Sequence, residues 1–466
     1  MTWVRSMIAR GKAPVVALIV VSIVSLGARA TLLDDPCRSP CRGAADHLLI
    51  FDEDYYVNAA RVIAGVRPPA GVPYAQAPSG DDPNAEHPQL AKLVMAGSIE
   101  LFGDGPFAWR LGSLVMGSLA ILGMFALVLA AGGGPWAAVG AAALMAADNL
   151  LLVHGRIATL DIYAVAAMVW GAALYLRGRP LIAGAVIGVG ACFKLVAPYV
   201  LAVLVLAELF GWASTRERPG HRLLRFLECL GVATGVFIGL LAVLDAVAPP
   251  YNDAAKQLIT GGALHHLSHM ISYAAHQTSP HGPKGIASYP WQWLVDSGWI
   301  TYLSIVPSHP SAGLTNIQPE VHFLGLINPP ILLAGLIGLG LAAFSGLKRR
   351  VGRPSPRAAA GAGAWAFGRV SAEWAERANR RGTAAAPVSV PVLAVAWFLG
   401  TFVPFLALTL IWRRTSYLYY MVIVMPGIYV AAAFLLERVR WRWLLALWLV
   451  AIAIGAGLLY PFNPFY

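Results

Sequence analysis

Charged side chains are scarce in this sequence. Asp, Glu, Lys and Arg make up 12% of its 466 residues, whereas 58% of the residues are hydrophobic. A typical soluble domain is about 25% charged, so a chain of this composition could not cover a globular surface with polar groups. Many apolar runs approach the roughly 20 residues that cross a bilayer as a helix. The sequence therefore predicts an all-α, polytopic protein of the cell membrane.

Cysteine is also rare. Four cysteines in the whole chain exclude a disulfide-rich scaffold. Cys37 and Cys41 lie in PCRSPCRG, just after the first apolar run, and their spacing leaves both a local disulfide and two free thiols open. Cys192 and Cys229 fall within apolar runs, where we expect small buried hydrophobic residues.

The few charges are mostly positive, and the net charge is +11. Lys and Arg gather in short connectors between apolar runs, which is typical of cytoplasmic loops and not of a nucleic-acid surface. We therefore expect membrane lipids and no nucleic acid among the partners. Arg5, Arg10 and Lys12 precede the first apolar run, so an uncleaved first helix with a cytoplasmic N-terminus is expected.

About eleven membrane-spanning helices are expected, the first within PVVALIVVSIVSLGARATLL. The others are expected near residues 108–131, 136–152, 158–176, 181–194, 197–212, 225–248, 322–346, 388–411, 414–436 and 441–459.

The expected spans divide the chain into three parts. Residues 1–248 form a transmembrane catalytic module, residues 249–320 a His- and Trp-rich extracytoplasmic loop, and residues 321–466 the C-terminal transmembrane helices. The first module includes an outer loop, 34–107, with an amphipathic helix near each end. The last part includes a cytoplasmic loop, 347–387, that carries an interfacial helix.

Three adjacent carboxylates, Asp52, Glu53 and Asp54, follow the apolar segment LLIF at the start of an amphipathic helix. One interpretation is helix capping and interaction with the helix dipole, which contributes at most about 1 kcal/mol. The other is that Asp52 or Glu53 is a general base, because a sugar acceptor's hydroxyl is a poor nucleophile until its proton is accepted. Adjacent side chains diverge, so we expect only one of the two to face an acceptor.

Several cations lie at the expected outer ends of spans, where the phosphate of a departing lipid carrier would need positive charge. The candidate phosphate-binding residues are His87, Lys92, Arg156, Lys194, Arg413 and Arg414. An arginine there can instead extend to lipid headgroups, and a histidine can pack or cap. Lys194 is harder to explain structurally, because a lysine among apolar residues costs roughly 3 kcal/mol in a membrane unless it is paired or hydrated. Asp161 is its expected carboxylate partner.

Histidines gather in the loop 249–320. His265 and His269 share a helical face, but neither an HExxH motif, a cysteine nor a carboxylate accompanies them, so a zinc site is the less favoured interpretation. A divalent cation is the one cofactor left open. Tyr289 and Trp291 suit sugar stacking and an interfacial aromatic belt equally well. Residues expected to contact the acceptor or support the site are Asp161, His269, Tyr289, Trp291 and Tyr417.

Six ordered segments resemble the protein O-mannosyltransferase family and its bacterial lipid-carrier-dependent relatives, which share the glycosyltransferase C fold. These segments are FDE, HPQLAK, FAWRLGS, RIATLDIY, the run around Lys194 and RTSYLYY. The resemblance implies inverting transfer of mannose from a polyprenyl-phosphate donor to an extracytoplasmic acceptor, such as Ser or Thr of an exported protein. It also implies Asp52 or Glu53 at the acceptor, and a phosphate site formed by Lys92, Arg156, Lys194 and Arg414.

The sequence departs from the family pattern in ways that leave the substrates open. HPQLAK differs from the motif His-Pro-Pro-Leu-Gly-Lys at two positions, and the outer loop has no inserted sugar-binding domain. An aminoarabinose- or arabinose-type transferase acting on a lipid or cell-wall glycan would share this layout. A transporter of a lipid-linked sugar is the alternative from another class. It is disfavoured because we find no internal repeat and because the charges lie at helix ends.

Overall fold

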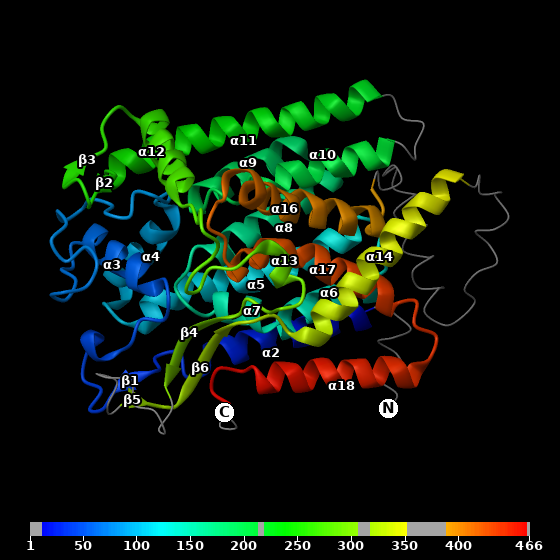
Figure 1. Ribbon diagram of the computed structural model, residues 1–466, viewed down its shortest axis with the longest axis horizontal. Helices are drawn as coiled ribbons and strands as arrows, with labels where there is room; N and C mark the ends of the chain where they lie inside the picture. Colours follow the sequence, from blue (N-terminus) through cyan, green and yellow to red (C-terminus); the bar gives the residue numbers. More distant parts are fainter. Residues whose placement is uncertain (1–11, 213–218, 306–316, 352–387, 464–466) are drawn as a thin grey trace.

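The computed structural model describes residues 12–212, 219–305, 317–351 and 388–463. The long helices lie side by side, and the short strands and the helices of the first outer loop gather at one end of the bundle (Figure 1). The last turns of α18 approach this end too, since the Tyr460 hydroxyl donates to the carbonyl oxygen of Ala28 at 2.9 Å. The bundle therefore has one end rich in loops, where the candidate site is found.

Eleven apolar helices form the bundle within the described residues. Five are long and apolar enough to cross a membrane: Ala13–Ala30 (α2), Pro106–Ala130 (α5), Pro219–Val247 (α11), Val390–Trp412 (α16), and Met421–Leu436 (α17) together with the short helix Leu418–Tyr420 (η2). Six others pack with them: Pro135–Ala147 (α6), Asp161–Leu176 (α8), Pro180–Phe193 (α9), Tyr199–Trp212 (α10), Pro329–Val351 (α14) and Arg442–Leu458 (α18). A multi-pass membrane protein is confirmed, whereas the number of eleven spans stays a prediction.

Small residues let these helices approach closely. A Cβ atom at Gly184 of α9 would lie 2.4 Å from the carbonyl oxygen of Cys229 in α11, and one at Gly188 would lie 2.6 Å from that of Ala233. Glycines four residues apart on one helical face allow two backbones to pack in this way without a side chain between them. The packing of α9 against α11 fixes the end of α9, where Lys194 lies.

Two of the expected spans were wrong in detail. The span 136–152 is interrupted at Asp148, because this carboxylate accepts hydrogen bonds from the Asn328 amide at 2.8 Å and the Tyr429 hydroxyl at 2.5 Å. A separate short helix, Asn149–His154 (α7), follows it. The span 322–346 begins instead with the strand Val321–Gly325 (β6), and its helix starts only at Pro329. The alternating segment forms a strand that pairs with another strand. The helix therefore begins only at the proline, a residue that suits the first turn of a helix.

In the part of the chain that the structure describes, the loop-rich end contains three antiparallel strand pairs. Strand β6 pairs with Ile300–Ile305 (β4), Cys37–Arg38 (β1) with Ile317–Gln318 (β5), and Tyr251–Asn252 (β2) with Gln257–Leu258 (β3). The connecting segments that carry these strands also contain the helices Glu53–Ile63 (α3), Leu90–Phe102 (α4), Ala263–His276 (α12) and Pro290–Trp293 (α13). The two expected amphipathic helices of the first outer loop are therefore present as α3 and α4.

The four cysteines agree with what was expected from the sequence. Cys37 and Cys41 form a disulfide, so of the two open alternatives the local disulfide is present. Cys192 and Cys229 are free and buried, as expected.

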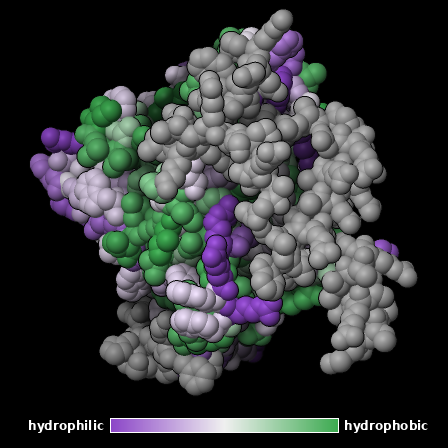
Figure 2. Space-filling model, turned by 90° about the vertical axis from the view of Figure 1, so that its right-hand side faces the viewer, coloured by the Kyte–Doolittle hydropathy of each residue, from purple (hydrophilic) through white to green (hydrophobic). Residues whose placement is uncertain are grey.

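The opposite end of the bundle faces the viewer in Figure 2, where hydrophilic and hydrophobic residues are mixed around the segments drawn in grey. Exposed Arg177 and Arg179, in the connector between α8 and α9, are among the charged residues of the described chain. Most of the expected cytoplasmic loop 347–387, including its interfacial helix, lies outside the described residues. The division into three domains stays a prediction.

Candidate active site

Asp52 directly precedes α3, yet its side chain forms no hydrogen bond to the backbone of that helix. The preceding residue, Phe51, has φ of 57°, a left-handed conformation that is strained for a bulky residue. The Phe51 ring stacks on Tyr302 with 4.2 Å between the ring centroids. This contact holds the turn that carries the half-buried Asp52, whose carboxyl lies within electrostatic reach of Lys194 and Asp161.

The electrostatic surroundings of Asp52 favour proton transfer near neutral pH. Burial raises the pKa of its carboxyl to about 7; the positive Lys194 opposes this shift, and the negative Asp161 adds to it. A carboxyl with a pKa near the working pH can accept a proton in a reaction and release it afterwards. A capping role would have needed a contact with the helix backbone, which Asp52 does not make.

Glu53 has a different environment. Both carboxylate oxygens are buried and accept hydrogen bonds from Arg110 at 2.8 Å, in a bidentate pair. The backbone amides of Ile50 and Ala158 also donate to it, at 2.8 and 2.7 Å. Four hydrogen-bond donors stabilise the charge of this carboxylate. They leave neither oxygen free to take a proton from the hydroxyl of a sugar acceptor. These contacts favour a structural role, in which Glu53 connects the segments FDE, FAWRLGS and RIATLDIY.

The expected contact between Lys194 and Asp161 is present. Lys194 ends α9, and its Nζ lies 2.7 Å from Oδ1 of Asp161 at the start of α8. The second oxygen of Asp161 is buried without a hydrogen-bond partner in the described chain and lies 3.7 Å from Nδ1 of His154. The ammonium also lies 5.5 Å from the centroid of the Tyr419 ring. The pair thus joins RIATLDIY, the Lys194 segment and RTSYLYY at one place.

Tyrosines surround this charged centre. Asp52 lies within electrostatic reach of the hydroxyls of Tyr56, Tyr302, Tyr417 and Tyr419. The rings of Tyr417 and Tyr419 are stacked, with centroids 5.4 Å apart. Aromatic faces with polar hydroxyls suit a sugar, which presents apolar C–H groups and hydroxyls together.

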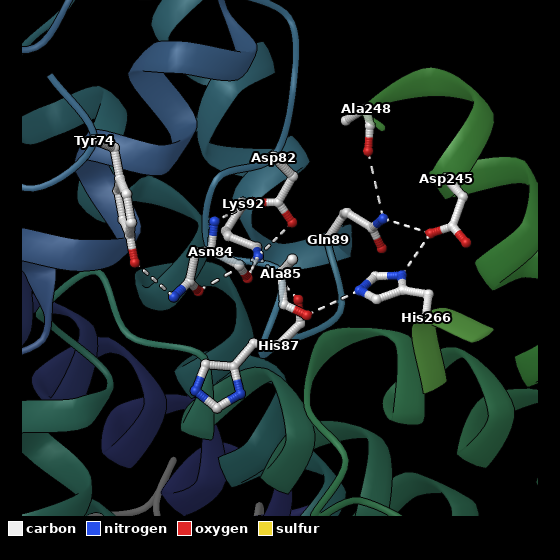
Figure 3. Close-up of polar contacts among 10 residues, drawn as sticks. All are labelled: Tyr74, Asp82, Asn84, Ala85, His87, Gln89, Lys92, Asp245, Ala248 and His266. Atoms are coloured by element: carbon white, nitrogen blue, oxygen red, sulfur yellow. Dashed lines mark hydrogen bonds and ion pairs between the residues drawn. The ribbon is translucent and has the colours of Figure 1, made fainter. Parts of the chain in front are cut away.

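The segment HPQLAK has two different basic residues. The buried Lys92 donates hydrogen bonds to Asp82 at 2.5 Å and to the carbonyl oxygens of Asn84 and His87 at 2.5 and 2.9 Å (Figure 3). Its donors are therefore occupied within its own loop. The His87 ring points away from this network in Figure 3. Burial holds the pKa of His87 well below its usual range, and Lys194, Lys92 and Arg414 contribute in the same direction. A neutral imidazole of this kind can still donate one hydrogen bond.

Arg156 is buried and donates to three backbone carbonyls at the end of α2, those of Arg29, at 3.0 Å, of Thr31 and of Leu32. Its guanidinium also lies 4.5 Å from the centroid of the Phe462 ring. A cation at a helix C-terminus satisfies carbonyls that have no partner within the helix. These contacts favour a structural role for Arg156 over the expected contact with a phosphate.

Four of the residues singled out from the sequence line a cavity of about 220 Å³. It is lined by parts of the segments 279–291 and 409–416, including Arg413 and Arg414. Tyr289 and Trp291 line it too, stacked with 4.3 Å between their ring centroids. Arg413 donates to the carbonyl oxygen of Pro280 at 3.2 Å, and Arg414 donates to that of Ala274. Two cations beside a stacked aromatic pair can hold an anionic or a sugar-like group.

His269 is half-buried on α12, and burial lowers its pKa, with His266 and His265 acting in the same direction. The Nδ1 atom of His265 is paired with the carbonyl oxygen of Thr260. Among the described residues, one group of three potential metal ligands was found, Cys37, Cys41 and His47. Two of these are joined in a disulfide, so the group does not suit a resident metal.

Sequence reasoning missed several residues that build the site. Arg110 is a charged residue inside the apolar helix α5, the same signal that drew attention to Lys194, and it could have been found by that signal. His154 and Tyr302 are joined by a hydrogen bond of 2.9 Å across 148 residues, and local patterns carry no information about such a pairing.

This arrangement has the glycosyltransferase C fold, which two solved structures share, and part of its sequence matches a known family. Residues 86–244 match the family model described as dolichyl-phosphate-mannose-protein mannosyltransferase. The polyprenol-phosphate-mannose–protein mannosyltransferase of Corynebacterium glutamicum is 32% identical over 123 residues, which are 25% of this chain and 22% of that relative. The chain thus matches less than a quarter of this relative's length. The predicted resemblance to the protein O-mannosyltransferase family is confirmed.

Two solved structures share the fold. The S. cerevisiae protein O-mannosyltransferase complex bound to the sugar donor superposes with a TM-score of 0.64 and 10% identity, over 97% of this chain and 90% of that chain. The Archaeoglobus fulgidus oligosaccharyltransferase tethered with an acceptor peptide has a TM-score of 0.52 and 14% identity, over 99% of this chain and 55% of that chain. At such identities the likeness concerns the fold alone, and it confirms the predicted glycosyltransferase C fold.

Proposed function

We propose that this protein transfers a sugar, with mannose as the first candidate, from a polyprenyl-phosphate donor to a hydroxyl of an extracytoplasmic acceptor. A Ser or Thr side chain of an exported protein is the proposed acceptor. The match of residues 86–244 to a mannosyltransferase family supports the donor, as does the solved relative described as bound to the sugar donor. The observation that carries the proposal is the half-buried Asp52 carboxyl, which has no hydrogen bond to its helix and lies near the Lys194–Asp161 pair.

The reaction is a single displacement. The acceptor oxygen forms a bond to the anomeric carbon while the bond from that carbon to the phosphate oxygen breaks, which inverts the anomeric configuration. Asp52 accepts the proton of the acceptor hydroxyl, because its raised pKa makes it a base that can be regenerated near pH 7. The electron pair of the broken bond leaves with the polyprenyl phosphate.

Lys194 is the proposed cation at the leaving phosphate, because its ammonium lies at the charged centre and a phosphate gains negative charge as the bond breaks. His87 and Arg414 are proposed to assist Lys194, since His87 lies within electrostatic reach of both Lys194 and Arg414 at this end of the bundle. Arg413 lies in the adjoining cavity, where we place part of the acceptor on Tyr289 and Trp291. Tyr417 and His269 remain candidates for contact with the acceptor.

Glu53, Lys92 and Arg156 are proposed to build the site without contacting the reacting atoms. Each is buried, and each is hydrogen-bonded to other protein groups. Asp161 orients Lys194. A divalent cation remains open as a cofactor, and transfer measured with and without EDTA would decide whether one is required.

We further propose that the loop-rich end faces the outside and that the basic connectors are cytoplasmic, as the positive-inside rule predicts. The catalytic residues are then divided between the module 1–248 and the segment 409–420, which lies in the C-terminal part of the chain. The proposed site therefore depends on both halves of the chain.

Donor profiling tests the proposal. Purified protein is incubated with a Ser- and Thr-rich peptide and with polyprenyl phosphates that carry mannose, glucose, arabinose or aminoarabinose. We expect the mannose donor to be consumed and the peptide to gain a hexose, with Asp52→Asn as the inactive control. Consumption of an arabinose-type donor alone would support the alternative transferase. Translocation of donor in proteoliposomes, without any bond cleavage, would contradict the enzyme proposal.

A further inference from the structure

His266 joins three elements near the candidate site (Figure 3). It is fully buried on α12, and its Nδ1 lies 2.7 Å from Oδ1 of Asp245 in α11. Its Nε2 lies 2.9 Å from the carbonyl oxygen of Ala85, just before the HPQLAK segment. The side-chain amide of Gln89 donates to the same Asp245 oxygen at 2.7 Å. The two helices and the loop meet at one imidazole ring.

The partners of this ring define its charge. A carboxylate and a carbonyl oxygen accept hydrogen bonds and cannot donate them, so both ring nitrogens of His266 face acceptors. A neutral imidazole has one N–H group and could satisfy only one of them. Both contacts are hydrogen bonds only when the ring carries two protons. Asp245 supplies the opposite charge, which stabilises a buried imidazolium.

The ring also fixes the backbone that carries His87. Ala85 lies two residues before His87, and its carbonyl is held by His266. On the other side of the same turn, Lys92 holds the carbonyls of Asn84 and His87. The backbone of residues 84–87 is therefore fixed by two buried basic side chains. The His87 side chain, which points away from both, takes its direction from this backbone (Figure 3).

We propose that His266, as an imidazolium paired with Asp245, is a positioning residue that fixes Ala85 and thereby directs His87 to the phosphate of the donor. This inference rests on the proposed transferase function. No atom of His266 contacts the reacting groups; it acts through the loop.

Other ionisable groups lie near the pair without contacting the ring. His265 and His269 are its neighbours on α12, and the Cys192 thiol of α9 lies within electrostatic reach of Asp245. On the loop, Lys92 is paired with Asp82, and Glu86 lies within reach of both. Asp245 is the one carboxylate of the described residues in contact with His266.

A side chain with fewer than two N–H donors at position 266 would leave one of these acceptors unpaired and would release the carbonyl of Ala85. Because His266 acts through the position of His87, we expect its loss to raise the KM for the donor more than it lowers turnover at saturating donor.

The test uses full-length protein, polyprenyl-phosphate mannose and three variants. His266→Gln should raise the KM for the donor about tenfold, the effect of one charge-assisted hydrogen bond. Asp245→Asn keeps the size of the side chain and the hydrogen bond from Nδ1 but removes the negative charge, so it should raise the KM less than His266→Gln does. The control His265→Gln replaces an exposed neighbour and should keep the parental KM.

A second measurement separates this inference from the proposed function. The melting temperature of His266→Gln should lie below those of the parent and of His265→Gln, whether or not any donor is consumed. A parent that consumes none of the donors would overturn the transferase, and this difference in melting temperature would still report that His266 joins the two helices and the loop. An active parent whose KM for the donor is shared by His266→Gln, or a His266→Gln variant that melts with the parent, would overturn the role of His266.

Discussion

The ammonium of Lys194 lies 2.7 Å from a carboxylate oxygen of Asp161, at the place where α9 ends and α8 begins. Both side chains are nearly buried, so neither charge is compensated by bulk water. Asp161 is also in the first turn of α8, where a negative charge is favourable. A lysine held in this way is fixed in position, and its ammonium can still contact an anion that enters the site.

Lys194→Met is expected to have two separable effects. It removes the cation from the leaving phosphate, so turnover should fall at least about 100-fold. It also leaves Asp161 as an unpaired buried charge, which should lower the free energy of unfolding by about 3 to 5 kcal/mol. The double variant Lys194→Met with Asp161→Asn should recover most of the stability and none of the turnover. Recovery of both in the double variant would reduce Lys194 to a counterion of Asp161.

Arg156→Gln provides the contrast, because Arg156 is also a buried cation from the same set of candidates. Its guanidinium bonds to backbone carbonyls at the end of α2, so the variant should unfold at lower temperature. The KM for the donor, measured on the fraction that remains folded, should equal that of the parent. A KM that rises as much as in Lys194→Met would place Arg156 at the phosphate.

Much of the helical bundle could be predicted from the sequence, because apolar runs between basic connectors are a local signal. The contact between Lys194 and Asp161 could also be predicted, since a buried lysine requires a partner and few carboxylates lie at that end of the spans. The break at Asp148 could not. It depends on a hydrogen bond from Tyr429, which lies 281 residues away, and local hydropathy does not report such contacts.

The different environments of Asp52 and Glu53 could likewise not be predicted from the sequence. Two adjacent carboxylates look equivalent in FDE, and only the tertiary structure brings Arg110 and the Ala158 amide to one of them. For the same reason the sequence did not show that Lys92 and Arg156 bond to groups within the protein. The sequence predicted that charged residues gather at one end of the helices. Which of these charges are paired depends on the tertiary packing.

The pH dependence of turnover should reflect Asp52. Burial raises the pKa of this carboxyl to about 7, and a base acts only when deprotonated. Turnover at saturating donor should therefore increase as the pH rises from 5 to 8, with a midpoint near 7 and a slope of one proton. Measured rates that already reach their plateau at pH 5 would mean that the base has an ordinary carboxyl pKa and that Asp52 is not the group observed.

Labelling of single cysteines should reveal the orientation of the bundle. The native cysteines are either joined in a disulfide or buried, so new exposed cysteines give the main signal. Ala70→Cys in the first loop should react with an impermeant thiol reagent in intact cells, whereas Arg179→Cys between α8 and α9 should react only after lysis. Both positions are exposed in the structure. The reverse pattern would place the proposed site in the cytoplasm and contradict an extracytoplasmic acceptor.

The adjacent carboxylates give the most direct test of the mechanism. Asp52→Asn keeps the size of the side chain and removes its basicity, so turnover should fall by about 10²- to 10⁴-fold while the donor still binds. The same change removes a charge whose pKa is raised by burial, and such a charge lowers stability as the pH rises through the interval between its unfolded and folded pKa values. Asp52→Asn should therefore be at least as stable as the parent at pH 8. Glu53→Gln should behave in the opposite way, because it leaves Arg110 without its buried partner and should lower the free energy of unfolding by about 3 to 5 kcal/mol. A stable Glu53→Gln protein without turnover, beside an active Asp52→Asn protein, would assign the base to Glu53.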